Sequence, residues 1–180
     1  TITMLGAAGR VTGSQFLLQS GRHELLVDCG LVQEEGLLER NAAPFEFEPR
    51  ELEHVLLTHA HLDHSGLLPR LVHHGFRGHI WATQASQHLA SVEYDRRIAL
   101  GPGIFATYQD AGHILGAASI LVELPGPHGP VRVLFSGDLG RPDRPILHDP
   151  DPPPAADYVV VESTYGDRVH PPEVVEDQLA

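Results

Sequence analysis

The sequence predicts an α/β (α+β) protein whose short strands end in polar, metal-binding residues. Short apolar runs recur along the chain and are followed by Gly, Asp or Pro, which is typical of buried strands and the turns after them. The segment from Ser65 instead has helical spacing, with Pro69 in the first turn. Its apolar stripe consists of Leu67, Leu68, Leu71 and Val72. A strand, a polar loop and a helix therefore follow one another in the middle of the chain.

The other elements are predicted from the same patterns. Strands are expected at residues 2–5, 14–19, 24–27, 54–57, 80–82, 104–108, 119–124, 131–135 and 158–161. The pair 119–124 and 131–135 forms a hairpin, because the loop 125–130 between them is rich in Pro and Gly. Helices are expected at residues 34–40, 65–72 and 83–94, and a final one after Pro171 and Pro172.

The length of 180 residues fits one domain with a sizeable core. We interpret residues 1–150 as this core and residues 151–157 as a stiff Pro-rich linker, because consecutive prolines support neither helix nor sheet. Residues 158–180 are interpreted as the last strand and the start of a further region.

The chain has a net charge of -12, with twelve basic residues, all of them arginine. A protein that binds nucleic acid tightly usually carries a basic face, since neutralised phosphates release counterions. Composition therefore argues against tight nucleic-acid binding by this surface. The single Cys29 excludes an internal disulfide, and no stretch reads as a signal peptide or a membrane helix, so we expect a cytoplasmic protein.

The most informative stretch is a set of four metal-binding side chains directly after the apolar run 54–57. His59 and His61 are two residues apart, so in an extended chain they point to the same side and can bind one ion. Asp63 and His64 follow where the chain turns, so they can face a second ion. Imidazole and carboxylate together suit zinc, with iron and manganese as alternatives.

Further polar residues stand where other strands end: Asp28, His113, Asp138 and Glu162. Because the ends of neighbouring strands meet at one edge of a sheet, we expect them near the central motif. The predicted metal ligands are His59, His61 and His113 for one ion, Asp63 and His64 for a second, and Asp138 as a bridge. Asp28 has two interpretations, as the cap of a turn or as a carboxylate that holds a ligand histidine in place.

Together these residues resemble the metallo-β-lactamase superfamily, and three further segments are similar to its β-CASP branch of RNA-processing endoribonucleases. These segments are 110–117 (DAGHILGA), 135–141 (FSGDLGR) and 162–166 (ESTYG). The resemblance implies an αββα sandwich with two zinc ions between the sheets, and hydrolysis of single-stranded RNA by a metal-bound hydroxide. It implies that Asp63 and Asp138 position this hydroxide, and that Asp28 and Glu162 support the ligands from behind.

The chain departs from the branch in two ways. The branch carries a whole β-CASP domain after the motif at Glu162, then a C-terminal part with a late histidine of the second metal site; the sequence ends at Ala180. The stretch between Tyr94 and Ile104 is also shorter than the branch leads one to expect. The second ion, left with Asp63, His64 and the shared Asp138, is therefore expected to bind more weakly than the first.

Two other functions fit these features. The first is hydrolysis of a small thioester or phosphodiester, which the acidic composition favours. The second is a non-catalytic metal-binding subunit of an RNA-processing complex. For the RNA hydrolase itself, we expect RNA as the substrate and a completing protein chain or a second copy in a homodimer as a partner.

Overall fold

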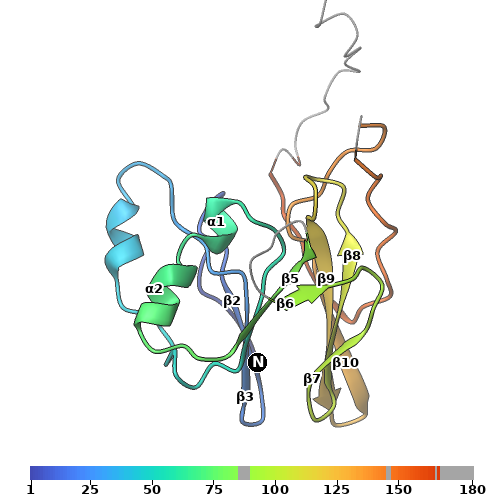
Figure 1. Ribbon diagram of the computed structural model, residues 1–180, viewed down its shortest axis with the longest axis horizontal. Helices are drawn as coiled ribbons and strands as arrows, with labels where there is room; N and C mark the ends of the chain where they lie inside the picture. Colours follow the sequence, from blue (N-terminus) through green and yellow to red (C-terminus); the bar gives the residue numbers. More distant parts are fainter. Residues whose placement is uncertain (85–89, 145–146, 165, 167–180) are drawn as a thin grey trace, which may run out of the picture.

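The computed structural model describes all residues except 85–89, 145–146, 165 and 167–180. Two β-sheets pack face to face, and helices lie against the outer face of one of them (Figure 1). The first sheet has the order β1 (Ile2–Met4), β2 (Phe16–Ser20), β3 (His23–Val27), β4 (His54–Leu56), β5 (His79–Thr83) and β6 (Ala90–Val92). Strands β1 to β3 pair antiparallel, and β3 to β6 pair parallel.

The second sheet has the order β11 (Tyr158–Val160), β10 (Gly129–Phe135), β9 (Ala118–Gly126), β8 (Ile104–Asp110) and β7 (Ile98–Gly101). Its strands are antiparallel except for the parallel pair β10 and β11. The predicted hairpin of residues 119–124 and 131–135 is confirmed, with one longer strand on each side of the turn. Residues 158–160 also belong to this sheet, as its edge strand.

The core lies between the two sheets, because alternate residues of each strand point inward. Leu18 and Leu25 of the first sheet face Ile120 and Phe135 of the second, and all four are almost fully buried. The intervening residues of the first sheet point outward and form a second apolar cluster under the helices. Both faces of the first sheet are therefore apolar, which is why its parallel strands read as continuous apolar runs.

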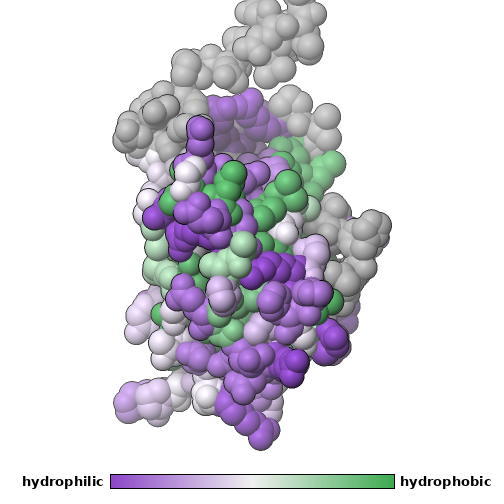
Figure 2. Space-filling view, turned by 90° about the vertical axis from the view of Figure 1, so that its left-hand side faces the viewer, coloured by the Kyte–Doolittle hydropathy of each residue, from purple (hydrophilic) through white to green (hydrophobic). Residues whose placement is uncertain are grey.

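Three short helices lie on the outer face of the first sheet: η1 (Leu38–Ala42), α1 (Leu62–Ser65) and α2 (Leu68–His73). The predicted stripe holds in part, since Leu67 and Leu71 are buried and Val72 is 44% exposed. The helix expected at 34–40 is a 3-10 turn shifted toward the C-terminus. Figure 2 shows that the face carrying these helices is hydrophilic over most of its area. No helix among the described residues is long and apolar enough to cross a membrane.

The prediction of a helix at 83–94 is wrong at both ends of this range. Thr83 is the last residue of β5, and residues 90–92 form β6, which pairs parallel with β5; residues 85–89 lie outside the described part. Parallel neighbours usually need a crossover of about a dozen residues, yet only residues 84–89 join these two strands. Strand β7 was not predicted either. Both are edge strands, extended through pairing with the neighbouring strands β5 and β8, which their own sequence patterns do not indicate.

The final helix expected after Pro171 lies outside the described residues.

The two sheets share one end, and this end carries the residues that matter for function. The chain leaves β3, β4, β8, β10 and β11 at this end, and the polar residues named above follow these strands.

Candidate metal centre

Four side chains from three segments bring their donor atoms to one point. His59 and His61 follow β4, His113 follows β8 and Asp138 follows β10. One donor atom from each lies within 4.8 Å of the others. His59 is fully buried, whereas His61 is exposed, so the cluster opens to solvent on one side.

The spacing of these atoms fits a tetrahedral zinc ion. His59 Nε2 lies 3.0 Å from His61 Nδ1 and 3.5 Å from Asp138 Oδ2, and His113 Nε2 lies 3.5 Å from the same oxygen. Two ligands of one zinc, each about 2.0–2.1 Å from it, lie roughly 3.3 Å apart. His113 Nε2 is buried and has no hydrogen-bond partner. A bound cation would supply the missing partner for its lone pair. Three imidazoles and a carboxylate therefore fit zinc.

A second set of donors lies beside the first. His64 Nε2 lies 3.2 Å from Asp138 Oδ1 and 3.7 Å from Asp63 Oδ2. Asp138 therefore presents one oxygen to His59 and His113 and the other to His64. The structure brings all six predicted ligands together, in two sets that share Asp138.

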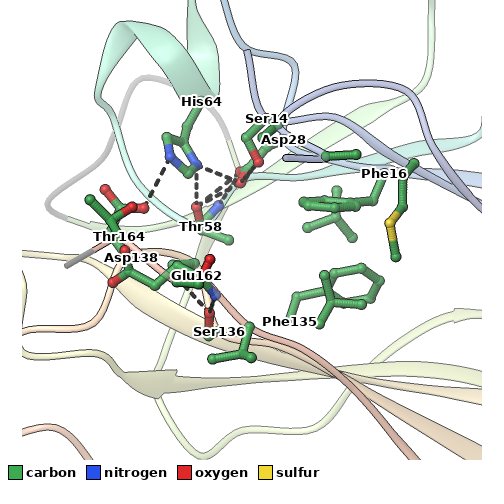
Figure 3. A pocket seen from close by; sticks show the side chains of 18 of the residues that line it. Ser14, Phe16, Asp28, Thr58, His64, Phe135, Ser136, Asp138, Glu162 and Thr164 are labelled. Carbon is green, nitrogen blue, oxygen red and sulfur yellow. Dashed lines mark hydrogen bonds and ion pairs between the residues drawn. The ribbon is translucent and has the colours of Figure 1, made fainter. Parts of the chain in front are cut away.

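Asp28 holds His64 from behind (Figure 3). It is buried and follows β3 with a left-handed backbone, φ 58°. His64 Nδ1 donates to Asp28 Oδ2 at 2.7 Å, and Thr58 donates its backbone amide to Asp28 Oδ1 at 2.8 Å. The Ser14 hydroxyl adds a longer bond of 3.3 Å. Asp28 lies where the second interpretation of the sequence places it, against a histidine of the cluster.

Thr58 extends this support to His59. Its hydroxyl donates to Asp28 at 2.9 Å, so its oxygen accepts from His59 Nδ1 at 3.0 Å. In His59 and His64 the supported nitrogen is therefore Nδ1, so Nε2 is the nitrogen that faces a metal. Sequence reasoning assigned no role to Thr58 or Ser14. The one feature of the sequence that could have indicated Thr58 is its position between the apolar run 54–57 and His59.

The electrostatics of the metal-free cluster follow from burial and charge. Burial, and then the neighbouring His64, lowers the pKa of His59 to about 4. Burial opposes the charging of His64 too, but Asp28 and Asp138 outweigh it and raise the pKa of His64 to about 10. Burial would raise the pKa of Asp138, yet contact with His64 lowers it to about 2. The neutral His59 and ionised Asp138 are in the forms that bind metals.

Glu162 is tied to the loop that presents Asp138. Its Oε1 accepts from the backbone amide of Leu139 at 2.7 Å, and its own amide donates to Ser136 Oγ at 3.0 Å. Gly137 between them has φ 55°, which a residue with a side chain rarely adopts. The end of β11 thereby fixes the turn after β10, and Glu162 supports Asp138 without joining the donor atoms.

A cavity of about 600 Å³ extends from the second set of donors between the edges of the two sheets (Figure 3). His64 and Asp138 line it together with an apolar wall that includes Phe16 and Phe135, whose ring centroids are 5.5 Å apart. Ser163, Thr164 and Arg10 line it as well. This volume lies within the range of ligand pockets.

Comparison with known sequences decides the family. The profile of the Metallo-beta-lactamase superfamily matches residues 8–169. The chain belongs to this superfamily. The match spans every residue of both donor sets and confirms the resemblance seen in the motifs.

The curated relatives of this member of the superfamily confirm its resemblance to the β-CASP branch of RNA-processing nucleases. It is 39% identical to Ribonuclease TTHA0252 of Thermus thermophilus, over 95% of this chain and 45% of that protein. It is 28% identical to Transcription termination factor FttA of Methanosarcina mazei, over 92% and 31%, and 29% identical to Cleavage and polyadenylation specificity factor 73 of Drosophila melanogaster, over 94% and 29%. The chain thus spans less than half the length of these relatives.

The alignment with the Thermus ribonuclease runs over 202 residues, more than the 180 of this chain. That ribonuclease therefore has internal positions without a counterpart here. Solved structures support the metallo-β-lactamase fold. Rm3 metallo-beta-lactamase superposes with a TM-score of 0.58 at 16% identity, over 79% of this chain and 62% of that one. YhfI from Bacillus subtilis gives 0.54 at 19% identity, over 76% and 61%.

Proposed function

We propose that this chain is a zinc-dependent hydrolase of RNA phosphodiester bonds. The observation that carries the proposal is the position of Asp138, whose two oxygens face two sets of donors. Two metal ions side by side suit the in-line displacement at a phosphorus atom, because they stabilise both the attacking and the leaving oxygen. The similarity to a protein named a ribonuclease, over almost the whole of this chain, supports RNA as the substrate.

The chain's own residues have distinct parts in this proposal. His59, His61 and His113 would hold the first ion, His64 and Asp63 would hold the second, and Asp138 would contribute to both sites. Zinc supplies a Lewis acid that polarises the phosphoryl oxygen and makes water a better nucleophile near neutral pH. The Asp63 and Asp138 carboxylates accept hydrogen bonds from the attacking water and orient its lone pair. Asp28 and Glu162 keep His64 and Asp138 in place.

The acidic composition limits how RNA can bind. Among the described residues that line the cavity beside the donors, Arg10 is the one arginine, and the chain has no lysine. The metal ions therefore supply most of the positive charge that meets a phosphate. We expect weak binding that depends strongly on the metal. A second protein chain or a second copy is the partner that would enlarge the contact with RNA.

The test is cleavage of end-labelled single-stranded RNA by protein loaded with zinc. The matched control is His61→Ala, because His61 is exposed and its loss leaves the core intact. Wild type should cleave, and the variant should be slower by about a hundredfold or more, since a metal supplies several kcal/mol of transition-state stabilisation. Equal rates would mean a contaminating nuclease. No cleavage by wild type with two bound zinc ions would overturn the proposal.

The cavity of about 600 Å³ favours one alternative, hydrolysis of a small thioester or phosphodiester. Its apolar wall beside His64 suits the organic part of such a molecule. The same two proteins assayed on an acyl thioester and on bis(4-nitrophenyl) phosphate separate the alternatives. Turnover of either compound without RNA cleavage favours the small-molecule hydrolase. No turnover with one bound ion per chain favours the non-catalytic subunit.

A further inference from the structure

His113 is held differently from the other histidines of the metal centre. His59 and His64 lie on the helix side of the cluster, where Thr58 and Asp28 fix their rings. His113 lies on the loop between β8 and β9, and among the described residues no group forms a hydrogen bond with either nitrogen of its ring. The position of its ring therefore depends on what fixes the backbone of this loop.

The start of this loop is bound to residues 148–151, which run into the Pro-rich segment 151–157. The backbone amide of Asp110 donates to Asp151 Oδ2 at 2.9 Å, and the amide of Asp151 donates back to the carbonyl of Asp110 at 2.9 Å. Asp110 Oδ1 in turn accepts from the amide of Gly112 at 2.8 Å. A chain of hydrogen bonds thus leads from Asp151 to the residue before His113.

Close packing joins the same segment to the loop. Gly112 has φ 62°, and a Cβ there would lie 2.8 Å from the carbonyl oxygen of His148 and 2.7 Å from Pro150 Cδ. The carbonyl of Ala111 also accepts from the amide of Gly140, two residues after Asp138, at 2.8 Å. The segment therefore braces the loop that presents His113, and through it the loop that presents Asp138.

We propose that Asp151 is a positioning residue of the metal centre. Its reciprocal pair with Asp110 fixes the loop so that His113 Nε2 meets Asp138 and His59. The Pro-rich segment 151–157, which its composition predicts to be a linker, then helps to support the metal site through Asp151. The proposal rests on zinc binding by the cluster and is independent of the substrate.

The chain contains a matched control in Asp157. The amide of Arg132 donates to Asp157 Oδ2 at 2.8 Å, and the amide of Asp157 donates to the carbonyl of Arg132 at 2.9 Å. This is the same reciprocal pair, built from an exposed aspartate of the same Pro-rich stretch. It lies at the amino end of β11, opposite the end that carries Glu162. Its loss removes one negative charge and one hydrogen bond without touching the loop of His113.

The experiment measures zinc affinity of metal-free protein by competition with a chromogenic chelator, and thermal unfolding of the same samples by circular dichroism. Asp151→Ala should weaken the tighter site about three- to tenfold, which is the range one hydrogen bond supports. Asp151→Asn retains an acceptor oxygen and should stay within about twofold of wild type. Asp157→Ala should lower the melting temperature comparably and leave the zinc affinity unchanged.

Wild-type affinity in Asp151→Ala, or an equal loss in Asp157→Ala, would overturn the proposal. A loss in Asp151→Asn as large as in Asp151→Ala would also overturn it, because the effect would then be one of charge. If Asp151→Ala does not fold, Asp151→Glu replaces it, since the longer side chain keeps the charge and moves the acceptor. Wild-type affinity in that variant counts against the proposal in the same way.

Discussion

His64 Nδ1 lies 2.7 Å from Asp28 Oδ2, and this contact decides which nitrogen of His64 faces the metal centre. Asp28 and Thr58 together fill the space behind both buried histidines.

The first prediction concerns the contact between Asp28 and His64. Asp28→Asn keeps the shape and the left-handed backbone, which Asn tolerates, but removes the charge. We expect zinc affinity to fall by about 10–100-fold, as for other partners of ligand histidines. Calorimetric titration measures it, and unchanged affinity contradicts it.

Zinc titration of the metal-free wild type should show two unequal sites. The first set has three histidines and Asp138, whereas the second shares Asp138 and adds only His64 and Asp63. Fewer protein ligands leave more positions to water, so the second ion should bind more weakly. Plasma mass spectrometry of protein purified without added metal should give less than two ions per chain. Two tight, equal sites would contradict this prediction.

Arg10 should act on RNA binding and not on the chemical step. It lies in the loop between β1 and β2 and lines the cavity beside His64 and Asp138. Arg10→Gln should raise KM for RNA with little change in kcat, and should reduce the salt dependence of binding by about one counterion. The control is Arg22→Gln, in the exposed turn between β2 and β3. Equal effects in both variants would show a general charge effect.

His54 should make stability depend on pH. Its Nε2 donates to the carbonyl of Leu100 at 2.7 Å and its Nδ1 accepts from Trp81 Nε1 at 3.1 Å, so the ring is neutral and links the two sheets. Burial, with His79 beside it, lowers the pKa of His54 below 6.5. The unfolded chain therefore takes up the proton first, and this contribution to stability is present above pH 6.5 and is lost as the pH falls below it.

Urea unfolding at about pH 7.5 and about pH 5.5 measures this effect. His54→Gln keeps a donor and an acceptor and does not titrate, so its stability should fall less on acidification. The comparison is made with chelator present, because the histidines of the metal centre titrate as well. An equal loss in both proteins would assign the pH dependence to other groups.

Cys29 should be inert in the folded protein. It is fully buried, and burial, followed by the charge of Asp28, raises its pKa to about 12. The thiolate is the reactive form, so a disulfide reagent such as DTNB should not react at pH 8 until the protein is unfolded. Reaction of the folded protein at the rate of a free thiol would contradict the prediction. The Cys29→Ser variant has no thiol and gives the background rate of the reagent.

The sequence by itself determined the parts that depend on neighbouring residues. A strand followed by a turn and a helix fixes where His59, His61, Asp63 and His64 point, because side-chain direction in a strand alternates. Those elements are present in the structure, as are all of the predicted strands, with shifted ends. His113 and Asp138 were found for a related reason, since a polar residue directly after a buried strand comes to the edge of the sheet.

Only the tertiary structure decided the contacts between distant segments. Asp28 meets His64, and Asp110 meets Asp151, across separations of 36 and 41 residues. These pairs depend on the order and register of strands, and the cost of closing such long loops is met only by the whole packed core. The strand β6 was mistaken for a helix for another reason: its residues are extended through pairing with the neighbouring strand β5 and not through their own preference.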